Sequence, residues 1–190
     1  MTVPLAYGRG RLPVTFPDDA TTVIEPRALP GLANERASLV AALESPIGAP
    51  PLREWLRPGC RICILFTDIT RATPNERIIP WLLDHLESAG VQRGQVTLLC
   101  QLGTHRPCTR DELERMLTPE VVANWRVMNH EPFNHAACVQ VGTTRTGVPA
   151  WIHRECVDAD VRIVTGFIEP HFFAGFSGGP KGIMPGVAHV

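Results

Sequence analysis

The sequence has no long apolar segment and very little net charge. No run approaches the ~18 apolar residues of a membrane-spanning helix, and residues 1–20 lack the apolar stretch of a secretory signal. These absences predict a cytoplasmic protein that does not span a membrane. A formal net charge of −1 also argues against nucleic acid and anionic membranes as partners, because both attract basic surfaces.

Lysine is almost absent. Of the 18 basic residues, 17 are arginine, and Lys181 is the single lysine. A compositional bias explains most of this difference, since arginine serves as well as lysine on most surfaces. An amine, unlike a guanidinium, can lose its proton readily and form a covalent adduct. Lys181 is therefore a candidate for a chemical role, although one retained lysine is also compatible with chance.

Length and composition suit one ordinary domain or part of a larger one. The 190 residues are 44% hydrophobic and 19% charged, a balance typical of a folded chain. Three strong apolar runs predict strands at 60–66, 95–101 and 161–165, the first with the continuous pattern of a strand buried on both faces. Weaker strand candidates lie at 11–16, 125–128, 137–141 and 148–152.

Helical patterns alternate with these strands. Asn34 is a candidate cap for a helix at 34–44, and Asn75 for a helix at 76–88. A T-x-x-E capping box at Thr109–Glu112 opens a helix toward Leu117. The alternation predicts an α/β fold, with a mostly parallel sheet and flanking helices in a Rossmann-like arrangement.

Six cysteines lie at positions 60, 63, 100, 108, 138 and 156. Cys60 and Cys63 form a C-x-x-C pair, but no second pair follows, and both lie in the first predicted strand. A structural role is the favoured interpretation, and a redox or metal role is the alternative. Reduced thiols are expected in a cytoplasmic protein.

Polar loops follow all three strong strands. Thr67–Arg71 (TDITR) follows the first, Gly103–Pro107 (GTHRP) the second, and the glycine-rich segment Gly166–Gly182 the third. Carboxyl ends of parallel strands meet at one edge of a sheet, where ligands bind beside the topological switch point. We therefore expect one site there, with five chemically able residues: Asp68, Arg71, His105, His171 and Lys181.

The residue types at this edge suit acid–base work on an anion. His105 and His171 can each accept or donate a proton near neutral pH. Two such groups could serve the two mirror-image forms of one substrate. Arg71 offers a bidentate fork for a carboxylate, and Asp68, three residues earlier, could orient that guanidinium. The other five histidines have no comparable setting, so we interpret them as structural or surface residues.

The glycine-rich segment could also cradle a phosphate with its backbone N–H groups. It is not a Walker A loop, because Pro180 precedes Lys181 and Gly182 follows it, leaving no hydroxyl to hold magnesium. It also lacks the G-x-G-x-x-G pattern. A mononucleotide bound in some other way and a tight structural crossover both stay open.

Three segments resemble the amino-terminal half of the nickel-pincer lactate racemase family: TDITR, GTHRP and GFIEPHFFAGFSGGPKGIMPGVA. The similarity also includes ALESPIG at 42–48. It implies a racemase or epimerase of a 2-hydroxy acid such as lactate, acting by hydride transfer. The cofactor would be a nickel-pincer nucleotide, a pyridinium mononucleotide with two sulfur-containing arms that hold nickel, tethered at Lys181.

The resemblance also assigns roles to individual residues. His105 and His171 would be the two catalytic acid–base groups, and Arg71 would bind the substrate. The residues implied to bind the cofactor are Asp68, Ile69, Thr70, Arg71, Lys181 and Pro185. The roles of His105, His171, Arg71 and Lys181 agree with the chemistry argued above from the residues themselves.

Members of this family have a second domain that supplies a nickel-ligating histidine after the PGVA segment. Here the sequence ends at Val190, and His189 lies too close to PGVA to correspond to that ligand. We therefore expect residues 1–190 to form a truncated amino-terminal catalytic and cofactor-tethering domain without a metal ligand of its own. An inactive nucleotide- or anion-binding module is the alternative; a hydrolase is disfavoured, because no G-x-S-x-G elbow is present.

Overall fold

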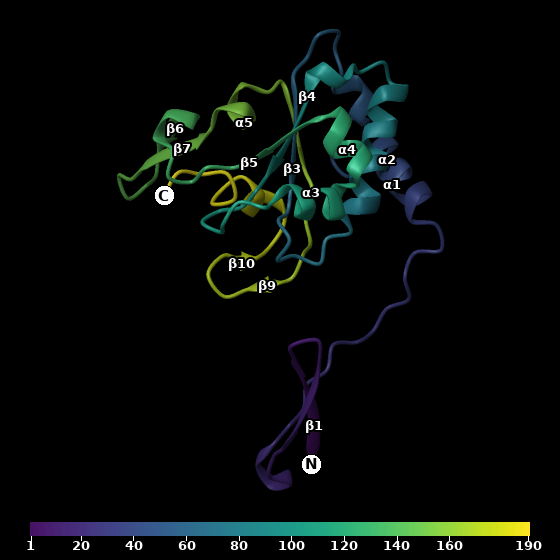
Figure 1. Cartoon of the computed structure of the whole chain (residues 1–190), viewed down its shortest axis with the longest axis vertical. Coiled ribbons are helices and arrows are strands. Elements are labelled where there is room, and N and C mark those ends of the chain that lie inside the picture. The colour runs from purple at the N-terminus through teal and green to yellow at the C-terminus, as the bar shows by residue number, and fades with distance from the viewer. The chain divides into compact units, whose positions relative to one another are not determined.

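The computed structural model describes residues 1–190 and divides into two compact units, Met1–Ala33 and Asn34–Val190. The first unit contains an antiparallel ribbon of β1 (Thr2–Tyr7) and β2 (Gly10–Thr15), purple in Figure 1. The strand predicted at 11–16 is thus present as β2, whereas β1 was not foreseen. Pro13 lies opposite Pro4 in this ribbon, where two edge strands tolerate the missing N–H groups.

The second unit is built on a four-stranded parallel sheet. Its strands are β3 (Ile62–Phe66), β4 (Val96–Cys100), β5 (Arg126–Asn129) and β8 (Val161–Val164), in the spatial order β5-β4-β3-β8. Numbered along the chain, this order is 3-2-1-4, that of the first four strands of a Rossmann fold. The predicted α/β class is confirmed, and the topological switch point falls between β3 and β8.

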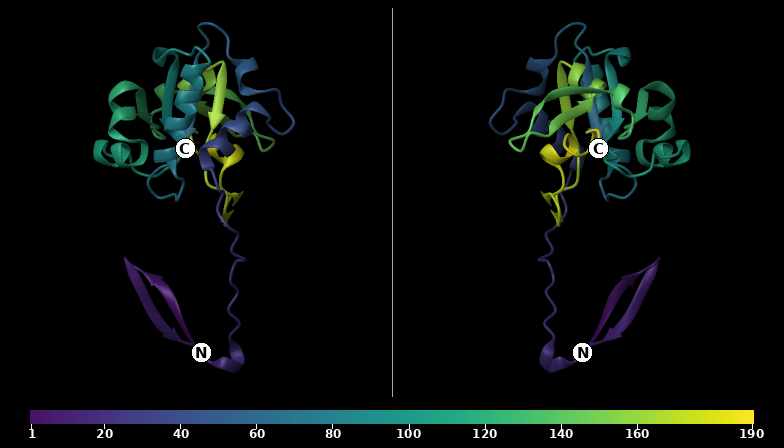
Figure 2. Two further views of the ribbon diagram at one scale, coloured as in Figure 1. Left: turned by 90° about the vertical axis from the view of Figure 1, so that its right-hand side faces the viewer. Right: turned by 90° about the vertical axis from the view of Figure 1, so that its left-hand side faces the viewer.

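Helices cover one face of this sheet and a mixed layer covers the other (Figures 1 and 2). The first face packs against α2 (Asn75–Ser88), α3 (Arg110–Leu117) and α4 (Pro119–Asn124), with α1 (Glu35–Glu44) beside α2. The second face packs against α5 (Arg154–Asp158), the antiparallel hairpin β6 (Cys138–Thr143)–β7 (Pro149–His153) and the segment around Val187.

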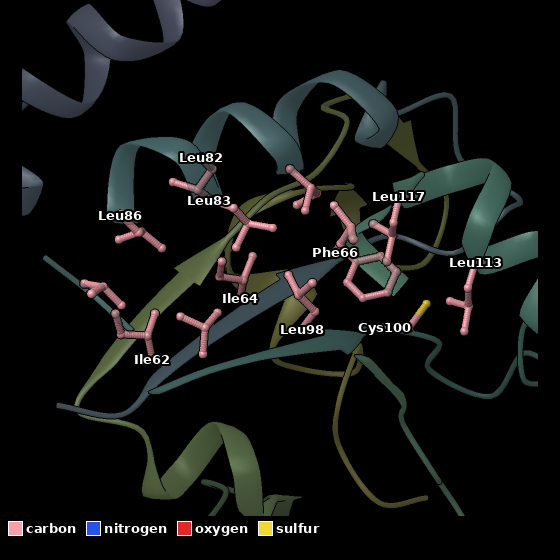
Figure 3. Packing of buried hydrophobic residues seen from close by; sticks show 14 of the residues in the cluster. Ile62, Ile64, Phe66, Leu82, Leu83, Leu86, Leu98, Cys100, Leu113 and Leu117 are labelled. Atoms are coloured by element: carbon pink, nitrogen blue, oxygen red, sulfur yellow. The ribbon is translucent and has the colours of Figure 1, made fainter. Parts of the chain in front are cut away.

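The side chains of β3 explain why its run is apolar throughout. Ile62, Ile64 and Phe66 enter the helix-covered cluster that Figure 3 shows, whereas Cys63 and Leu65 enter the cluster on the opposite face. All five are at most 1% exposed. Since strand side chains alternate between faces, a central strand covered on both sides needs an apolar residue at every position.

The caps agree with the prediction at two helices and differ at a third. Asn34 accepts a hydrogen bond from the Ala37 amide at 2.9 Å, and the Thr109–Glu112 capping box is formed. Asn75, by contrast, is the first residue of α2 rather than its cap. Its buried side-chain amide donates to the carbonyl and hydroxyl oxygens of Thr67, so it ties the helix start to the end of β3.

Other differences concern the short elements. The candidate strand at 125–128 joins the parallel sheet as β5, but those at 137–141 and 148–152 form the separate hairpin β6–β7. The helices α4 and α5 were not predicted. The first opens at Thr118, which adopts a φ of 84° and caps the helix with its hydroxyl before Pro119; a six-residue helix carries too little periodicity to be recognised.

The C-x-x-C pair has a structural setting. Cys60 packs in the helix-covered cluster and Cys63 in the cluster on the other face of the sheet. All six cysteines are buried and unpaired by disulfides. Because strand alternation separates the two thiols, Cys60 and Cys63 do not form a chelating pair. No helix in the chain is both long and apolar enough to cross a membrane.

Candidate active site

A cavity of about 930 Å³ opens at the carboxyl ends of β3, β4 and β8. The loops after these strands line it, and the β9 (Pro170–His171)–β10 (Gly175–Phe176) ribbon extends from the sheet edge beside it (Figures 1 and 2). Its lining includes these predicted site residues: Asp68, Thr70, Arg71, His105, His171, Lys181 and Pro185. Ile69 is not among the lining residues and is 40% exposed.

The Asp68 carboxylate is the most buried charged group of the site. Its Oδ2 atom lies 2.5 Å from His105 Nδ1, and its Oδ1 atom accepts hydrogen bonds from the Thr70 amide (3.1 Å) and hydroxyl (2.6 Å). The side chain is 5% exposed, against 46% for His105. The expectation that Asp68 orients the Arg71 guanidinium is therefore wrong: its carboxylate is hydrogen-bonded to Thr70 and His105, and Arg71 pairs with Glu169.

Arg71 has a different carboxylate partner. Its Nη1 atom lies 3.5 Å from Glu169 Oε1, and its side chain is 24% exposed. Glu169 is held in place by Ser177, whose hydroxyl accepts from the Glu169 amide at 3.0 Å. The guanidinium is thus positioned in the cavity by an ion pair with the glycine-rich segment, and this pair leaves some of its N–H donors free for another anion.

His171 is held by backbone amides rather than by a carboxylate. Its Nδ1 atom accepts hydrogen bonds from the amides of Phe173 (3.3 Å) and Ala174 (3.2 Å), and its ring stacks on Phe172 with centroids 5.2 Å apart. Partial burial and the positive charges of Lys181 and Arg71 lower the pKa of His171. The ring is therefore biased toward its neutral form near pH 7.

Lys181 lies in a short 3₁₀ helix, Gly179–Gly182, which follows the β9–β10 ribbon in the chain. Burial, followed by the nearby Arg71 charge, lowers the pKa of its amine, which increases the neutral, nucleophilic fraction. The next residue has no room for a side chain: a Cβ on Gly182 would lie 2.1 Å from Gln101 Oε1 and 2.6 Å from Val164 Cγ1. Glycine at 182 thus allows the helix to pack directly on the ends of β4 and β8.

The site lacks a metal-binding cluster. No group of three or more His, Cys, Asp or Glu side chains gathers in this chain in a way that could hold a metal ion. The two cavity histidines each use Nδ1 for a hydrogen bond and come from different loops. The side chains of the cavity thus suit proton transfer, anion binding and amine chemistry.

Sequence reasoning missed several polar residues of the lining, among them Glu169 and Gln101. Glu169 stands two positions before His171, so strand-like alternation would have placed both on one side of the segment. Gln101 ends the second predicted strand, and its amide donates to the Thr165 carbonyl at 2.6 Å, joining the ends of β4 and β8. A polar residue at the end of an apolar strand was the available signal.

Comparison with known families matches residues 7–190 to the lactate racemase N-terminal domain. The chain belongs to this family. It is 33% identical over 191 aligned residues to a lactate racemase of Thermoanaerobacterium thermosaccharolyticum, covering 99% of the chain and 45% of that relative. It is 36% identical over 155 residues to a lactate racemase of Lactiplantibacillus plantarum, covering 82% of the chain and 36% of that relative.

Solved structures agree with this assignment to the lactate racemase N-terminal domain family. The lactate racemase apoprotein of T. thermosaccharolyticum matches the whole chain with a TM-score of 0.84 and 33% identity, over 44% of its own length. A Thermotoga maritima protein matches 86% of the chain with a TM-score of 0.70 and 26% identity, over 40% of its length. The chain thus spans less than half the length of these relatives.

Proposed function

We propose that this chain is the cofactor-tethering and acid–base part of a racemase or epimerase that acts on a 2-hydroxy acid such as lactate. The observation that carries the proposal is the gathering of an amine, two imidazoles and a guanidinium around one cavity, at the switch point of a lactate racemase N-terminal domain. If the carbon-bound hydrogen leaves as hydride, a base must take the hydroxyl proton of each enantiomer, and two histidines can serve the two enantiomers.

Arg71 would hold the substrate carboxylate. Its guanidinium pairs with Glu169 at 3.5 Å, a distance longer than that of a strong charge-assisted hydrogen bond. A substrate carboxylate could therefore take over the free N–H donors in a bidentate pair without displacing a tight contact. Fixing the carboxylate would direct the adjacent hydroxyl-bearing carbon into the cavity between the two histidine loops.

The residues present fit a nickel-pincer nucleotide. Lys181 would form the covalent tether, because its lowered pKa favours the neutral amine that a covalent bond requires. Asp68, Thr70, Arg71 and Pro185 line the same cavity and would hold the rest of the group. When bound, the cofactor would supply a hydride acceptor, chemistry that no side chain of the cavity provides.

The nickel ligand would come from outside this chain, which contains no metal-binding cluster. We propose that it is a histidine of the carboxyl-terminal half that the relatives possess and that the aligned region does not include. The chain would then form one wall of the active site, and turnover would need both halves. Because Lys181 lies in this chain, the cofactor tether can be tested without measuring turnover.

The test is a comparison of wild-type chain and Lys181→Arg by intact-mass spectrometry after exposure to nickel-pincer nucleotide. Wild type is expected to gain the mass of the bound group. Lys181→Arg preserves the positive charge but should lose the adduct, because the guanidinium stays protonated at working pH. Equal loading of the two proteins would refute the tether at position 181.

A second outcome would favour the alternative function. An anion- or nucleotide-binding module would use Lys181 electrostatically, so Lys181→Arg would retain reversible binding and neither protein would gain mass. Equilibrium dialysis with nicotinic acid mononucleotide, a nickel-free pyridinium nucleotide, measures that binding. Arg77→Lys, at an exposed arginine of α2 that does not line the cavity, is the matched control for a charge-preserving substitution.

A further inference from the structure

The two histidines of the cavity contact groups of opposite hydrogen-bonding character. His105 Nδ1 faces the Asp68 carboxylate at 2.5 Å, and His171 Nδ1 faces the backbone amides of Phe173 and Ala174. A carboxylate can only accept hydrogen bonds, whereas a backbone amide nitrogen can only donate them. The same ring atom must therefore play opposite roles in the two residues.

The Asp68 contact determines the tautomer of His105. Oδ1 of the carboxylate already accepts two hydrogen bonds from Thr70, and the side chain is 5% exposed. Its remaining partner must therefore donate, and this is Nδ1–H of His105. In the neutral ring the other nitrogen, Nε2, then carries a lone pair and can accept a proton.

The amide contacts determine the tautomer of His171 in the opposite sense. Two N–H groups point at Nδ1, at 3.3 and 3.2 Å, so this atom holds the lone pair and the ring proton lies on Nε2. The lowered pKa of His171 supports a neutral ring. A proton on Nδ1 would confront two amide hydrogens, so protonation there requires the ring to leave these contacts.

We propose that Asp68 is a positioning residue that, together with the Phe173–Ala174 amides, holds the two histidines in opposite tautomers. In the neutral rings, Nε2 of His105 can then act as a base in the cavity, and Nε2 of His171 can donate a hydrogen bond. The inference rests on the proposed function where it speaks of a base acting on substrate. The tautomers themselves are a property of this chain, whatever it binds.

The consequence for a 2-hydroxy acid is that only one of the two enantiomers finds a ring nitrogen ready to accept its hydroxyl proton. A hydroxyl facing His105 passes its proton to Nε2, and the resulting imidazolium keeps its Nδ1–H bond to Asp68. The substrate oxygen can meanwhile accept a hydrogen bond from His171 Nε2. A hydroxyl facing His171 meets no lone pair until the ring changes tautomer: Nδ1 must leave the amides and take up a proton from water, and Nε2 must release its proton to water.

Rates alone would not reveal this asymmetry. The two enantiomers have equal free energies, so kcat/KM must be the same in both directions. Nitrogen chemical shifts report the tautomers directly. We therefore specify long-range ¹H–¹⁵N correlation spectra of the ¹⁵N-labelled 190-residue chain, recorded where both rings are neutral and assigned with His105→Gln and His171→Gln.

The expected spectrum shows a protonated Nδ1 and an unprotonated Nε2 for His105, with the reverse pattern for His171. Asp68→Ala should move the His105 proton toward Nε2 while the His171 signals stay unchanged. Thr70→Val is the matched control, because it removes a donor to Asp68 but keeps the carboxylate, and it should preserve the wild-type pattern. A change in the overall fold would instead move both rings and the remaining amides.

Two results would overturn the inference: the same tautomer for both rings in wild type, or His105 nitrogens unaffected by Asp68→Ala in a folded variant. If that variant does not fold, the wild-type spectrum still decides. Failure here is separable from failure of the proposed function. Opposite tautomers in a chain that never gains mass at Lys181 would support this inference and contradict the racemase proposal.

Discussion

The two loops that carry the cavity histidines are supported in different ways. The His105 loop is braced by neighbouring elements: Arg106 makes two hydrogen bonds to Glu112 (2.8 and 2.6 Å), and the Cys108 amide and carbonyl both bond the side chain of Asn129. The His171 loop is braced mainly by itself, through Ser177 hydrogen bonds to the backbone of Phe167 and Glu169.

Exposure follows the same division. Phe172 and Phe173, beside His171, are 88% and 89% exposed, so these large apolar side chains contribute little to the packing of this chain. On the His105 side, Cys108 is 5% exposed and packs in the main core. His105 is thus positioned by a loop that packs on the core. His171 is positioned by the β9–β10 ribbon, whose segment packs closely on the sheet at Gly182.

The largest expected effect is on the rate of turnover, and we expect it from a substitution of the histidine in either loop. In the chain joined to the carboxyl-terminal half of the Thermoanaerobacterium relative, His105→Ala and His171→Ala should each lower the racemisation rate by ~10²–10⁴, the usual value of general acid–base help. His135→Ala, a histidine beside Trp151 outside the cavity, is the control. Near-normal rates in either cavity variant would contradict a two-histidine mechanism.

The next effect concerns the glycine-rich end of the His171 loop. Gly182→Ala should destabilise the chain by about 1–3 kcal/mol, the typical cost of overpacking, because its Cβ would overlap Gln101 and Val164. Urea unfolding measures the change. Gly94→Ala is the matched control, since nothing lies within 4 Å of its added Cβ. Equal midpoints for both variants would show that this end is not closely packed.

A smaller effect is expected on the pH dependence of stability, and it should arise in the His105 loop and not in the His171 loop. Hydrogen bonds from Arg106, and then from the Thr109 amide, lower the pKa of Glu112 from its ordinary 4.5 to about 2. A carboxylate with a lowered folded-state pKa stabilises the fold above its unfolded pKa and loses that contribution as pH falls through the folded value. Glu112→Gln should therefore lower the urea midpoint at pH 7.

The difference between Glu112→Gln and wild type should then shrink as pH falls from 4.5 toward 2, the window set by the two pKa values. Glu169→Gln, in the other loop, is the comparison variant, since its Arg71 pair is longer, at 3.5 Å, and its carboxylate is more exposed than that of Glu112. A Glu112→Gln difference that is constant from pH 7 to pH 2 would show that the carboxylate charge is not what braces the loop.

The smallest expected effect lies at the exposed aromatics. Phe172→Ser and Phe173→Ser should each change the free energy of unfolding by less than about 0.5 kcal/mol, as surface substitutions usually do. Phe66→Ala, at a fully buried phenylalanine of β3, should by contrast cost about 3–5 kcal/mol. A large loss in either serine variant, measured by urea unfolding, would mean that the ribbon packs more tightly than its exposure indicates.

Much of the fold followed from local patterns. The Thr109 capping box and the apolar run of β3 were readable because each signal lies within a few neighbouring residues and depends on backbone chemistry alone. The hairpin β6–β7 and the ribbon strand β1 were harder. Their pairing depends on partners that a short, partly polar strand does not specify, so strand candidates could be located but their sheet could not.

The candidate site divides in the same way. Residue types and their positions after strands were enough to select four residues that line the cavity, Arg71, His105, His171 and Lys181, because parallel strands bring their carboxyl ends to one edge. What the sequence determined by itself was thus the chemistry available at that edge. Tertiary structure alone decided the partners: Asp68 with His105, Glu169 with Arg71, and backbone amides with His171. The physical reason is that a hydrogen bond or an ion pair requires its two groups to lie within about 4 Å of each other, and Arg71 and Glu169, 98 positions apart, meet that condition only after the sheet has formed.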